Sequence, residues 1–549
     1  MWYFGDMTYE PVIGLEIHVE LKTRTKMFCG CLNDPNEKHP NMNICPVCMA
    51  HPGTLPVINE EAIRKVIMVG LALNGFIPEF SQFDRKNYFY PDLPKGYQIS
   101  QYKHPLVEGG YLDIDIPRKS QIANRDSEKD DEQLAIRDTR RIRITRVHLE
   151  EDTGRLAHIS GGPSEDSGRS ASLIDFNRAG VPLMELVTEP DLRTGEEVKA
   201  FGEELQRILR YIGASDADME KGQMRVEVNI SLREIADKRG QDTDLRGNSQ
   251  RQSTSSRRES ALGLGTKVEI KNINSFKYAA DAVDYEIKRQ TAILERGEKV
   301  LQETRGWNEH KGESFSQRSK ESAHDYRYFP EPDLPPLRVS QKMIDELQAL
   351  LPELPVQKRE RFEREYGIES ASIEILAREK AFADYYEKVM SELKEHDKET
   401  PEKPKKNLAA SVASFLTGDF TRLLKETLAP ITEVRVTPEN FAELVLLAAE
   451  DKISNTTAKQ VLEEMFRTGE DPSNIIDTKG LWQMSDASDL EDIARHIVKE
   501  NPKAIEDYKK GRTTSLQFLV GQIMKETRGK ANPKLVQEII KRMLENEMA

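Results

Sequence analysis

The spacing of apolar residues changes once along this chain of 549 residues, near residue 340. Before that point apolar and polar residues alternate in several stretches, for example at residues 142–144 and 226–232, with the period of two that a half-buried strand requires. Beyond it the period is 3.6, and Thr437-Pro438 supplies a helix N-cap followed by proline at the first helical position. Strand-forming and helix-forming sequence therefore occupy different parts of the chain.

The first part also contains helical patterns, at residues 60–73, 194–212 and 276–296. We therefore predict an α+β fold, with an antiparallel-sheet domain at residues 1–338, an all-α domain at 339–478 and an all-α tail domain at 479–549. A chain of this length is expected to form several hydrophobic cores. Residues 118–137 and 234–263 are rich in charged or polar residues, which predicts surface insertions.

The composition limits what the chain can do. A net charge of −14 argues against general coating of nucleic acid, although a basic patch in one domain is compatible with it. No apolar run approaches the roughly 18 residues of a membrane helix. The first residues lack the basic and apolar regions of a signal peptide. These features predict a cytoplasmic protein without a membrane segment.

All four cysteines lie within one short segment, residues 29–48, as Cys29, Cys31, Cys45 and Cys48. Cys-x-Cys followed by Cys-x-x-Cys supplies four thiolates for a tetrahedral zinc ion, and disulfides are not expected in a reducing compartment. Because four protein ligands leave no open position for water, such a zinc would be structural. The alternative is a set of four buried free thiols.

Residues 12–21 alternate strictly between apolar and polar side chains, with Glu16 and His18 on the polar face. Side chains two residues apart on a strand stand roughly 6.6 Å apart on the same side, so these two can converge on one ion or phosphate. In the alternative interpretation the polar face of the strand simply meets water.

Further carboxylates follow at residues 150–152 and at Glu185. If Glu16, His18, Glu151 and Glu185 meet, they form an oxygen-rich site with one imidazole, suited to a Mg²⁺ ion that keeps waters for phosphates. Residues 150–152 alone are equally explained by a charged turn.

Residues 84–101 mix basic and aromatic side chains around Pro91 and Pro94. Arg85 and Lys86 are candidates for binding the phosphates of ATP. The alternative is a well-packed aromatic loop with solvated ends. No Walker-type loop is present, because the nearest match, at residues 162–170, lacks the lysine.

The last 70 residues carry many basic side chains, among them Lys525, Arg528 and Lys530. A basic helical surface of this kind can contact RNA. It is also a common way of keeping a helical domain in solution.

Several of these stretches together resemble one known family, the B subunit of the tRNA-dependent amidotransferase, GatB of the GatCAB complex. The resemblance lies in residues 12–21, 84–92, 148–154, 182–191, 225–233, 269–276, 325–333 and 518–524. The related archaeal family GatE carries a large extra domain before the tail, and no segment here is long enough to form one.

The resemblance implies a cradle-like catalytic domain, a helical domain and a YqeY-like tail domain that docks on tRNA. It implies a ligase that uses ATP to phosphorylate the side-chain carboxylate of misacylated Glu-tRNA(Gln) or Asp-tRNA(Asn). Ammonia made from glutamine by the GatA amidase subunit, within a heterotrimer that includes GatC, would then form the amide. A non-catalytic scaffold that binds tRNA in the same complex is the alternative.

The resemblance also assigns residues. In this family Mg²⁺ is held at the positions of Glu16, His18, Glu151 and Glu185, the same set that the residue types suggested. The four-cysteine zinc site occurs in some members and is absent from others, which marks it as structural. No amidase nucleophile is evident in this chain, consistent with ammonia being made elsewhere in the complex.

Overall fold

The computed structural model describes residues 9–117, 137–159, 171–235, 265–319, 326–399, 407–484, 487–509, 512, 514–527 and 529–546. These residues form two compact units, divided after Leu354. The predicted insertions at 118–137 and 234–263 lie almost entirely outside the described residues, as does Arg528.

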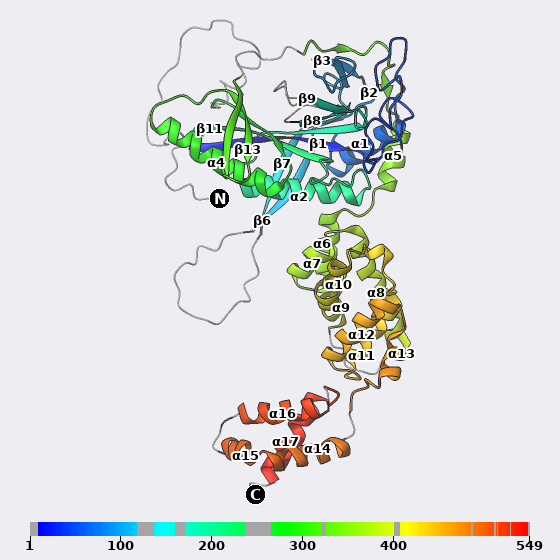
Figure 1. The fold of residues 1–549 in the computed structure, drawn as a ribbon, viewed down its shortest axis with the longest axis vertical. Helices are drawn as coiled ribbons and strands as arrows, with labels where there is room; N and C mark the ends of the chain where they lie inside the picture. Colours follow the sequence, from blue (N-terminus) through cyan, green and yellow to red (C-terminus); the bar gives the residue numbers. More distant parts are fainter. Residues whose placement is uncertain are drawn as a thin grey trace, which may run out of the picture. The chain divides into compact units, whose positions relative to one another are not determined.

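A large sheet runs through the first unit (Figure 1). Its strands follow the order β14-β13-β12-β11-β1-β10-β7-β5, and β6 also pairs with β7. Neighbouring strands are antiparallel, except that β12 and β13 are parallel. The strands are β1 (Tyr9–Glu20), β5 (Val107–Glu108), β6 (Tyr111–Pro117), β7 (Arg137–Glu151), β10 (Pro182–Thr188), β11 (Met224–Glu234), β12 (Val268–Ile273), β13 (Glu303–Asn308) and β14 (Glu313–Ser319).

Short strand pairs accompany this sheet. A small sheet has the order β15-β3-β4, and two pairs form as β16-β2 and β8-β9. Their bounds are β2 (Phe80–Ser81), β3 (Asp84–Asn87), β4 (Tyr97–Ser100), β8 (Arg155–Ile159), β9 (Ala171–Asp175), β15 (Phe329–Pro330) and β16 (Leu337–Arg338).

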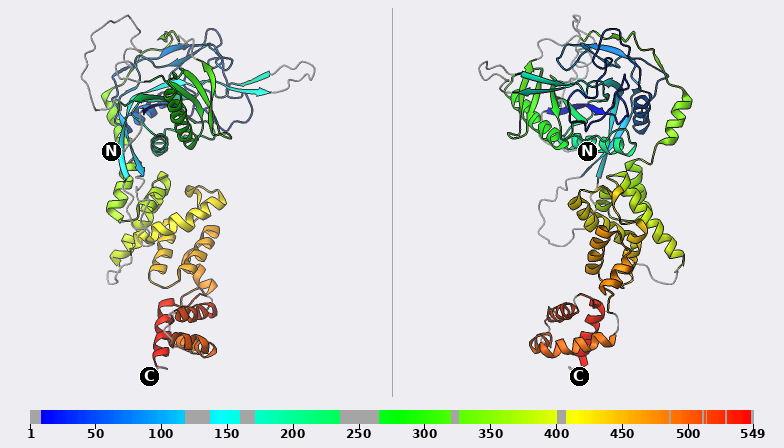
Figure 2. Two further views of the ribbon diagram at one scale, coloured as in Figure 1. Left: turned by 90° about the vertical axis from the view of Figure 1, so that its left-hand side faces the viewer. Right: turned by 45° about the vertical axis from the view of Figure 1, so that its right-hand side comes forward.

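Helices cover one face of the large sheet. They are α1 (Glu60–Ala72), α2 (Gly195–Tyr211) and α4 (Phe276–Glu295), close to the predicted helical segments. Helices α2 and α4 lie side by side, as Figures 1 and 2 show. Between sheet and helices lies the main hydrophobic core, to which β1 contributes Ile13, Leu15, Ile17 and Val19. The apolar face of β1 is therefore buried, and its polar face points away from this core.

Helix α5 (Gln341–Leu350) belongs to the first unit, because its Leu347 is buried in that core. The unit therefore extends to Leu354, beyond the boundary predicted at residue 338. The change of period near residue 340 marks the start of helical structure, but it does not mark the end of the first packing unit.

The second unit is helical and contains two separate hydrophobic cores. The first core is built by α6 (Pro355–Tyr366), α7 (Ser370–Leu376), α8 (Lys380–Glu399), α9 (Leu408–Phe415), the π-helix η1 (Leu416–Phe420), α10 (Thr421–Thr427), α11 (Pro438–Ala449), α12 (Asn455–Thr468) and α13 (Pro472–Lys479). The second is built by α14 (Ala487–Glu500), α15 (Pro502–Lys509), α16 (Thr514–Glu526) and α17 (Pro533–Asn546). The predicted α+β fold, with helical structure after the sheet domain, is confirmed.

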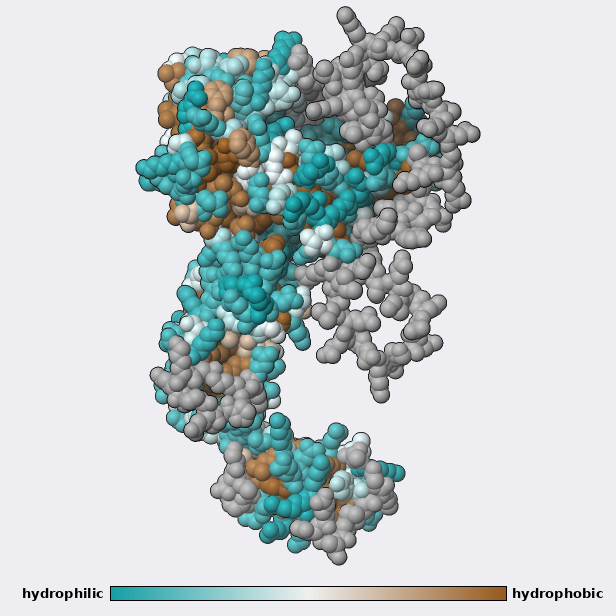
Figure 3. Space-filling model, turned by 180° about the vertical axis from the view of Figure 1, so that it is seen from behind, coloured by the Kyte–Doolittle hydropathy of each residue, from teal (hydrophilic) through white to brown (hydrophobic). Residues whose placement is uncertain are grey.

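Hydrophilic side chains dominate the face of the molecule seen in Figure 3, with apolar patches between them. Among the helices that the structure describes, none has both the length and the apolar character needed to cross a membrane.

Candidate active site and metal centre

The register of the central strands places histidine and glutamate side chains side by side. His18 on β1 lies opposite Glu185 on β10, and Glu185 lies opposite His148 on β7. On the other side of β1, Glu16 lies opposite Glu227 on β11. Since residues two apart on a strand share a face, Glu16 and His18 present their side chains on the face of the sheet that points away from the core.

His18 is the centre of a buried histidine and carboxylate group. Its Nε2 atom lies 3.2 Å from Glu185 Oε2 and 3.8 Å from Glu150 Oε1. One ligand atom from each of these three residues lies within 4.8 Å of the others, close enough to hold one metal ion. His148 Nε2 approaches the same oxygen of Glu185, at 3.6 Å. This group, His18, Glu150 and Glu185, is called the histidine group below.

The electrostatics of this group couple its members. Burial opposes protonation of His18, but the hydrogen bond to Glu185 and the charges of Glu185 and Glu150 outweigh it and raise its pKa to about 9. Burial likewise opposes ionisation of Glu185, yet the neighbouring His148 and His18 hold its pKa well below the ordinary value. Burial lowers the pKa of His148. The group therefore stabilises a carboxylate that faces a cation.

A second acidic group lies beside the first. Glu16, Glu227 and Glu269 on β12 each bring a carboxylate oxygen within 4.8 Å of the others. Lys271 Nζ partly balances them, at 3.0 Å from Glu227 and 3.3 Å from Glu269. Asn229 Nδ2 donates a hydrogen bond of 2.9 Å to Glu16. Like charges this close need a compensating cation, which Lys271 supplies in part.

Both groups line one cavity of about 470 Å³. Basic side chains, among them Lys86 and Arg146, complete its polar wall. Lys86 Nζ lies 3.8 Å from Glu150, and the charges of Glu150 and Glu185 raise its pKa even though burial acts in the opposite direction. Aromatic rings also line the cavity, from Tyr88, Tyr102, Tyr326 and Tyr328. A cavity with acids, bases and rings has the chemistry to bind phosphates, a divalent cation and a planar group.

The four residues predicted as one metal site are brought together only in part. His18 and Glu185 belong to the histidine group, and Glu16 lies in the neighbouring acidic group of the same cavity. Glu151 does not join them, and Glu150 takes the place predicted for it. Glu151 Oε2 instead lies 2.5 Å from Lys95 Nζ, and its Oε1 accepts a hydrogen bond from the Ile99 backbone.

The physical reason is strand alternation. Glu150 and Glu151 are successive residues of β7, so their side chains point to opposite faces. His148 and Glu150 have the same parity and share the face of Glu185. Applying this parity rule from His148 would have selected Glu150. Glu227 and Glu269 were also missed, although Glu227 alternates with Val226 and Val228 within a recognised strand.

The two predicted phosphate-binding residues have different surroundings. Lys86 lines the cavity, as described above. Arg85, its neighbour on β3, donates two hydrogen bonds of 2.7 Å to Glu331, and its guanidinium lies over the ring of Tyr97. Arg85 is thus held by a bidentate ion pair on the other face of the strand.

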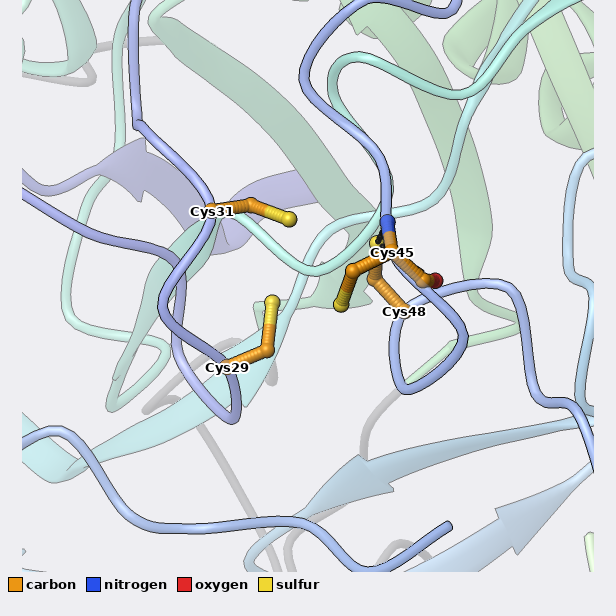
Figure 4. A group of neighbouring side chains, drawn as sticks. All are labelled: Cys29, Cys31, Cys45 and Cys48. Carbon is orange, nitrogen blue, oxygen red and sulfur yellow. Dashed lines mark hydrogen bonds between the residues drawn. The ribbon is translucent and has the colours of Figure 1, made fainter.

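The four cysteines come together from two loops, as Figure 4 shows. One sulfur of each lies within 4.8 Å of the others, close enough for one metal ion such as zinc. A tetrahedral site with Zn–S bonds of about 2.3 Å would separate the sulfurs by roughly 3.8 Å, which fits this cluster. Contact with Cys29 and a hydrogen bond from the Cys45 backbone, with the charge of Lys26, lower the pKa of Cys48 to about 5 against the effect of burial.

The predicted tRNA-binding residues lie at the C-terminal end. Lys525 is exposed in the last turn of α16, and Lys530 follows that helix. Arg528 lies outside the described residues, so its contribution stays a sequence prediction.

Comparison with known proteins adds independent findings. A family model described as the GatB/GatE catalytic domain matches residues 11–345, and one described as the GatB domain matches residues 398–544. The B subunit of aspartyl/glutamyl-tRNA(Asn/Gln) amidotransferase from Caldanaerobacter subterraneus subsp. tengcongensis is 44% identical over 538 residues, which cover 98% of this chain and 100% of that protein. Proteins of the same name from Thermoanaerobacter sp. and Persephonella marina are each 43% identical, with the same coverage.

Proposed function

The chain belongs to the family of aspartyl/glutamyl-tRNA(Asn/Gln) amidotransferase B subunits, as its motifs predicted, and on that premise we propose that it converts misacylated tRNA to its amide. The substrates would be Glu-tRNA(Gln), Asp-tRNA(Asn) or both. The observation that carries this proposal is the cavity of about 470 Å³ in which two carboxylate groups face Lys86 and Arg146. The relatives' name also supports a complex with GatA and GatC subunits in the cytoplasm.

The proposed reaction has two steps. A side-chain carboxylate oxygen of the aminoacyl group attacks the γ-phosphorus of ATP, and ADP leaves with the electrons of the broken P–O bond. Ammonia then attacks the acyl carbon, inorganic phosphate leaves, and the amide forms after loss of a proton. Phosphorylation is needed because a free carboxylate is a poor electrophile and phosphate is a good leaving group.

The residues present fit a magnesium ion, since the histidine group and Glu16 offer carboxylate oxygens and one imidazole beside a polar cavity. Bound there by Glu16, His18, Glu150 and Glu185, Mg²⁺ would neutralise charge on the phosphates. Lys86 and Arg146 would bind phosphate oxygens from the same wall. Lys271 would limit repulsion among Glu16, Glu227 and Glu269. We extend the proposal to a structural Zn²⁺ held by Cys29, Cys31, Cys45 and Cys48.

The experiment that tests this function uses the chain co-purified with the A and C subunits of its complex. It is incubated with ATP and each misacylated tRNA, first without an ammonia source and with hydroxylamine as a trap. An acyl phosphate intermediate gives an ATP-dependent hydroxamate on the tRNA-bound amino acid, and added ammonium chloride gives the amide. Absence of both products with either tRNA would contradict the proposal.

A further prediction concerns the tail. The core formed by α14–α17 is separate from the core of α6–α13, so a chain that ends at residue 479 should keep the preceding helices folded. We expect the KM for tRNA to rise on the order of tenfold, the effect of losing one or two phosphate contacts, with glutaminase activity unchanged. Steady-state kinetics measure both. A KM equal to that of the full chain would exclude tRNA docking by the tail.

A further inference from the structure

A lysine is buried beside the four-cysteine cluster. Lys26 is completely buried, a rare situation for a lysine that is not paired with a charge. Its Nζ atom lies 3.8 Å from Cys48 Sγ and donates a hydrogen bond of 3.2 Å to the Phe176 carbonyl. Within the part of the chain that the structure describes, Lys26 forms no salt bridge with a carboxylate. The thiolates are therefore its counter-charge.

The charge of a filled site explains why a cation is needed here. Four thiolates and one Zn²⁺ carry a net charge of −2, and burial of such a charge is unfavourable without a partner. Lys26 places one positive charge against the most buried of the four cysteines, Cys48. An ammonium in this position stabilises the filled site more than the empty one.

The cysteine segment is also bound to a turn at residues 175–180. The side chain of Asn41 accepts a hydrogen bond from the Phe176 backbone, and the Asn41 backbone donates one to Asp175. Asn177 donates to the His39 carbonyl and accepts from the Asn43 backbone. The backbone of Met27 donates to the Gly180 carbonyl. These bonds tie the order of the turn to the order of the cysteine segment.

The same turn holds the end of β7. The Gly180 backbone donates to the Asp152 carbonyl at 2.9 Å, and Arg178 donates to the Thr153 and Gly154 carbonyls at 3.0 and 2.8 Å. Gly180 has a φ of +82°, and a Cβ atom there would lie 3.6 Å from Cys48 Cβ, 3.7 Å from Lys26 Cδ and 4.0 Å from Glu151 Oε2. The cysteine cluster, Lys26 and Glu151 therefore meet at one glycine.

From this geometry we propose that Lys26 is a positioning residue that couples metal binding at the four cysteines to the turn at 175–180, and through it to Glu151 and Asp152. With metal bound, the ammonium is held between Cys48 and the Phe176 carbonyl and keeps the turn closed. Without metal, the ammonium loses its anionic partner and the turn loosens. This inference depends on the cysteine metal site and is independent of the proposed amidation.

The test compares Lys26→Met with Lys22→Met in the full-length protein. Lys22 is exposed and pairs with Asp216, so it controls for loss of a nearby lysine. Each protein is loaded with Co²⁺, and the thiolate-to-cobalt charge-transfer band is recorded. A positive charge beside sulfur raises the energy of this transition, so Lys26→Met should shift the band to longer wavelength. Lys26→Met should also release zinc to a chelator about 10- to 100-fold more readily, and Lys22→Met should match the wild type.

Hydrogen exchange provides the second measurement. In the wild type, zinc should protect the backbone amide of Gly180, which bonds to Asp152, and the protection should be lost in Lys26→Met. Asn41→Gly keeps Lys26 and suits the positive φ of 61° at this position, so it should lose part of the protection without moving the cobalt band. An unshifted band in Lys26→Met would overturn the inference. Wild-type exchange at Gly180 that does not depend on zinc would also overturn it, even if Lys26→Met fails to fold.

Discussion

Glu150→Gln is expected to lower ATP-dependent phosphorylation of Glu-tRNA by roughly 10²- to 10³-fold, whereas Glu151→Gln should retain this step. Glu150 faces His18 and Glu185 in the proposed magnesium site, whereas Glu151 pairs with Lys95 on the other face of β7. A divalent cation supplies several kcal/mol of charge stabilisation, and each factor of ten in rate is about 1.4 kcal/mol. Single-turnover formation of the trapped hydroxamate measures the step directly.

The two variants are matched controls for each other. They are adjacent, remove the same charge and introduce the same side chain, so a difference between them reports the face of the strand. His18→Ala should behave as Glu150→Gln does, with tRNA binding nearly intact. Full phosphorylation by Glu150→Gln and His18→Ala would remove the magnesium assignment and favour the non-catalytic scaffold.

Cys45→Ser is expected to reduce the bound zinc from about one ion per chain to nearly none. Residues 29–56 have little regular structure of their own, and the metal would hold their two loops together. A ligand present at about 1,000 times its dissociation constant stabilises a fold by about 4 kcal/mol. At about 2 °C per kcal/mol, the unfolding midpoint of the first unit should fall by roughly 5–10 °C. Elemental analysis and calorimetry measure the two effects.

Met42→Ser is the control for this variant. Met42 lies in the same segment, is exposed and is not a ligand of the cluster. It should therefore keep both zinc and the wild-type midpoint. If freshly purified, reduced wild-type protein contained no zinc, the cysteine assignment would be refuted, and four free thiols would be the correct interpretation.

Much of the local structure could be predicted from the sequence. The alternation at residues 12–21 predicted a strand with one buried face, and β1 buries Ile13, Leu15 and Ile17. Thr437-Pro438 predicted a helix start, and the Thr437 side chain accepts a hydrogen bond from the Asn440 backbone at the N-terminus of α11. The spacing of the cysteines predicted that four thiols would meet, and they do. Such features depend on neighbours within a few residues.

The composition of the cavity was less accessible. Glu227 and Glu269 join Glu16 from β11 and β12, although they follow it by more than 200 residues. Lys26 gave no signal at all in the sequence, because a lysine is usually exposed and only the tertiary fold buries it beside Cys48.

The sequence by itself determined the family, the α+β class and which residue types could serve a metal or a phosphate. Only the tertiary structure decided which of them meet, as the pair Glu150 and Glu151 demonstrates. Periodicity follows from the covalent geometry of the backbone and can be read locally. Register follows from hydrogen bonds and packing between strands far apart in the chain, and a shift of one residue exchanges the two faces of a strand.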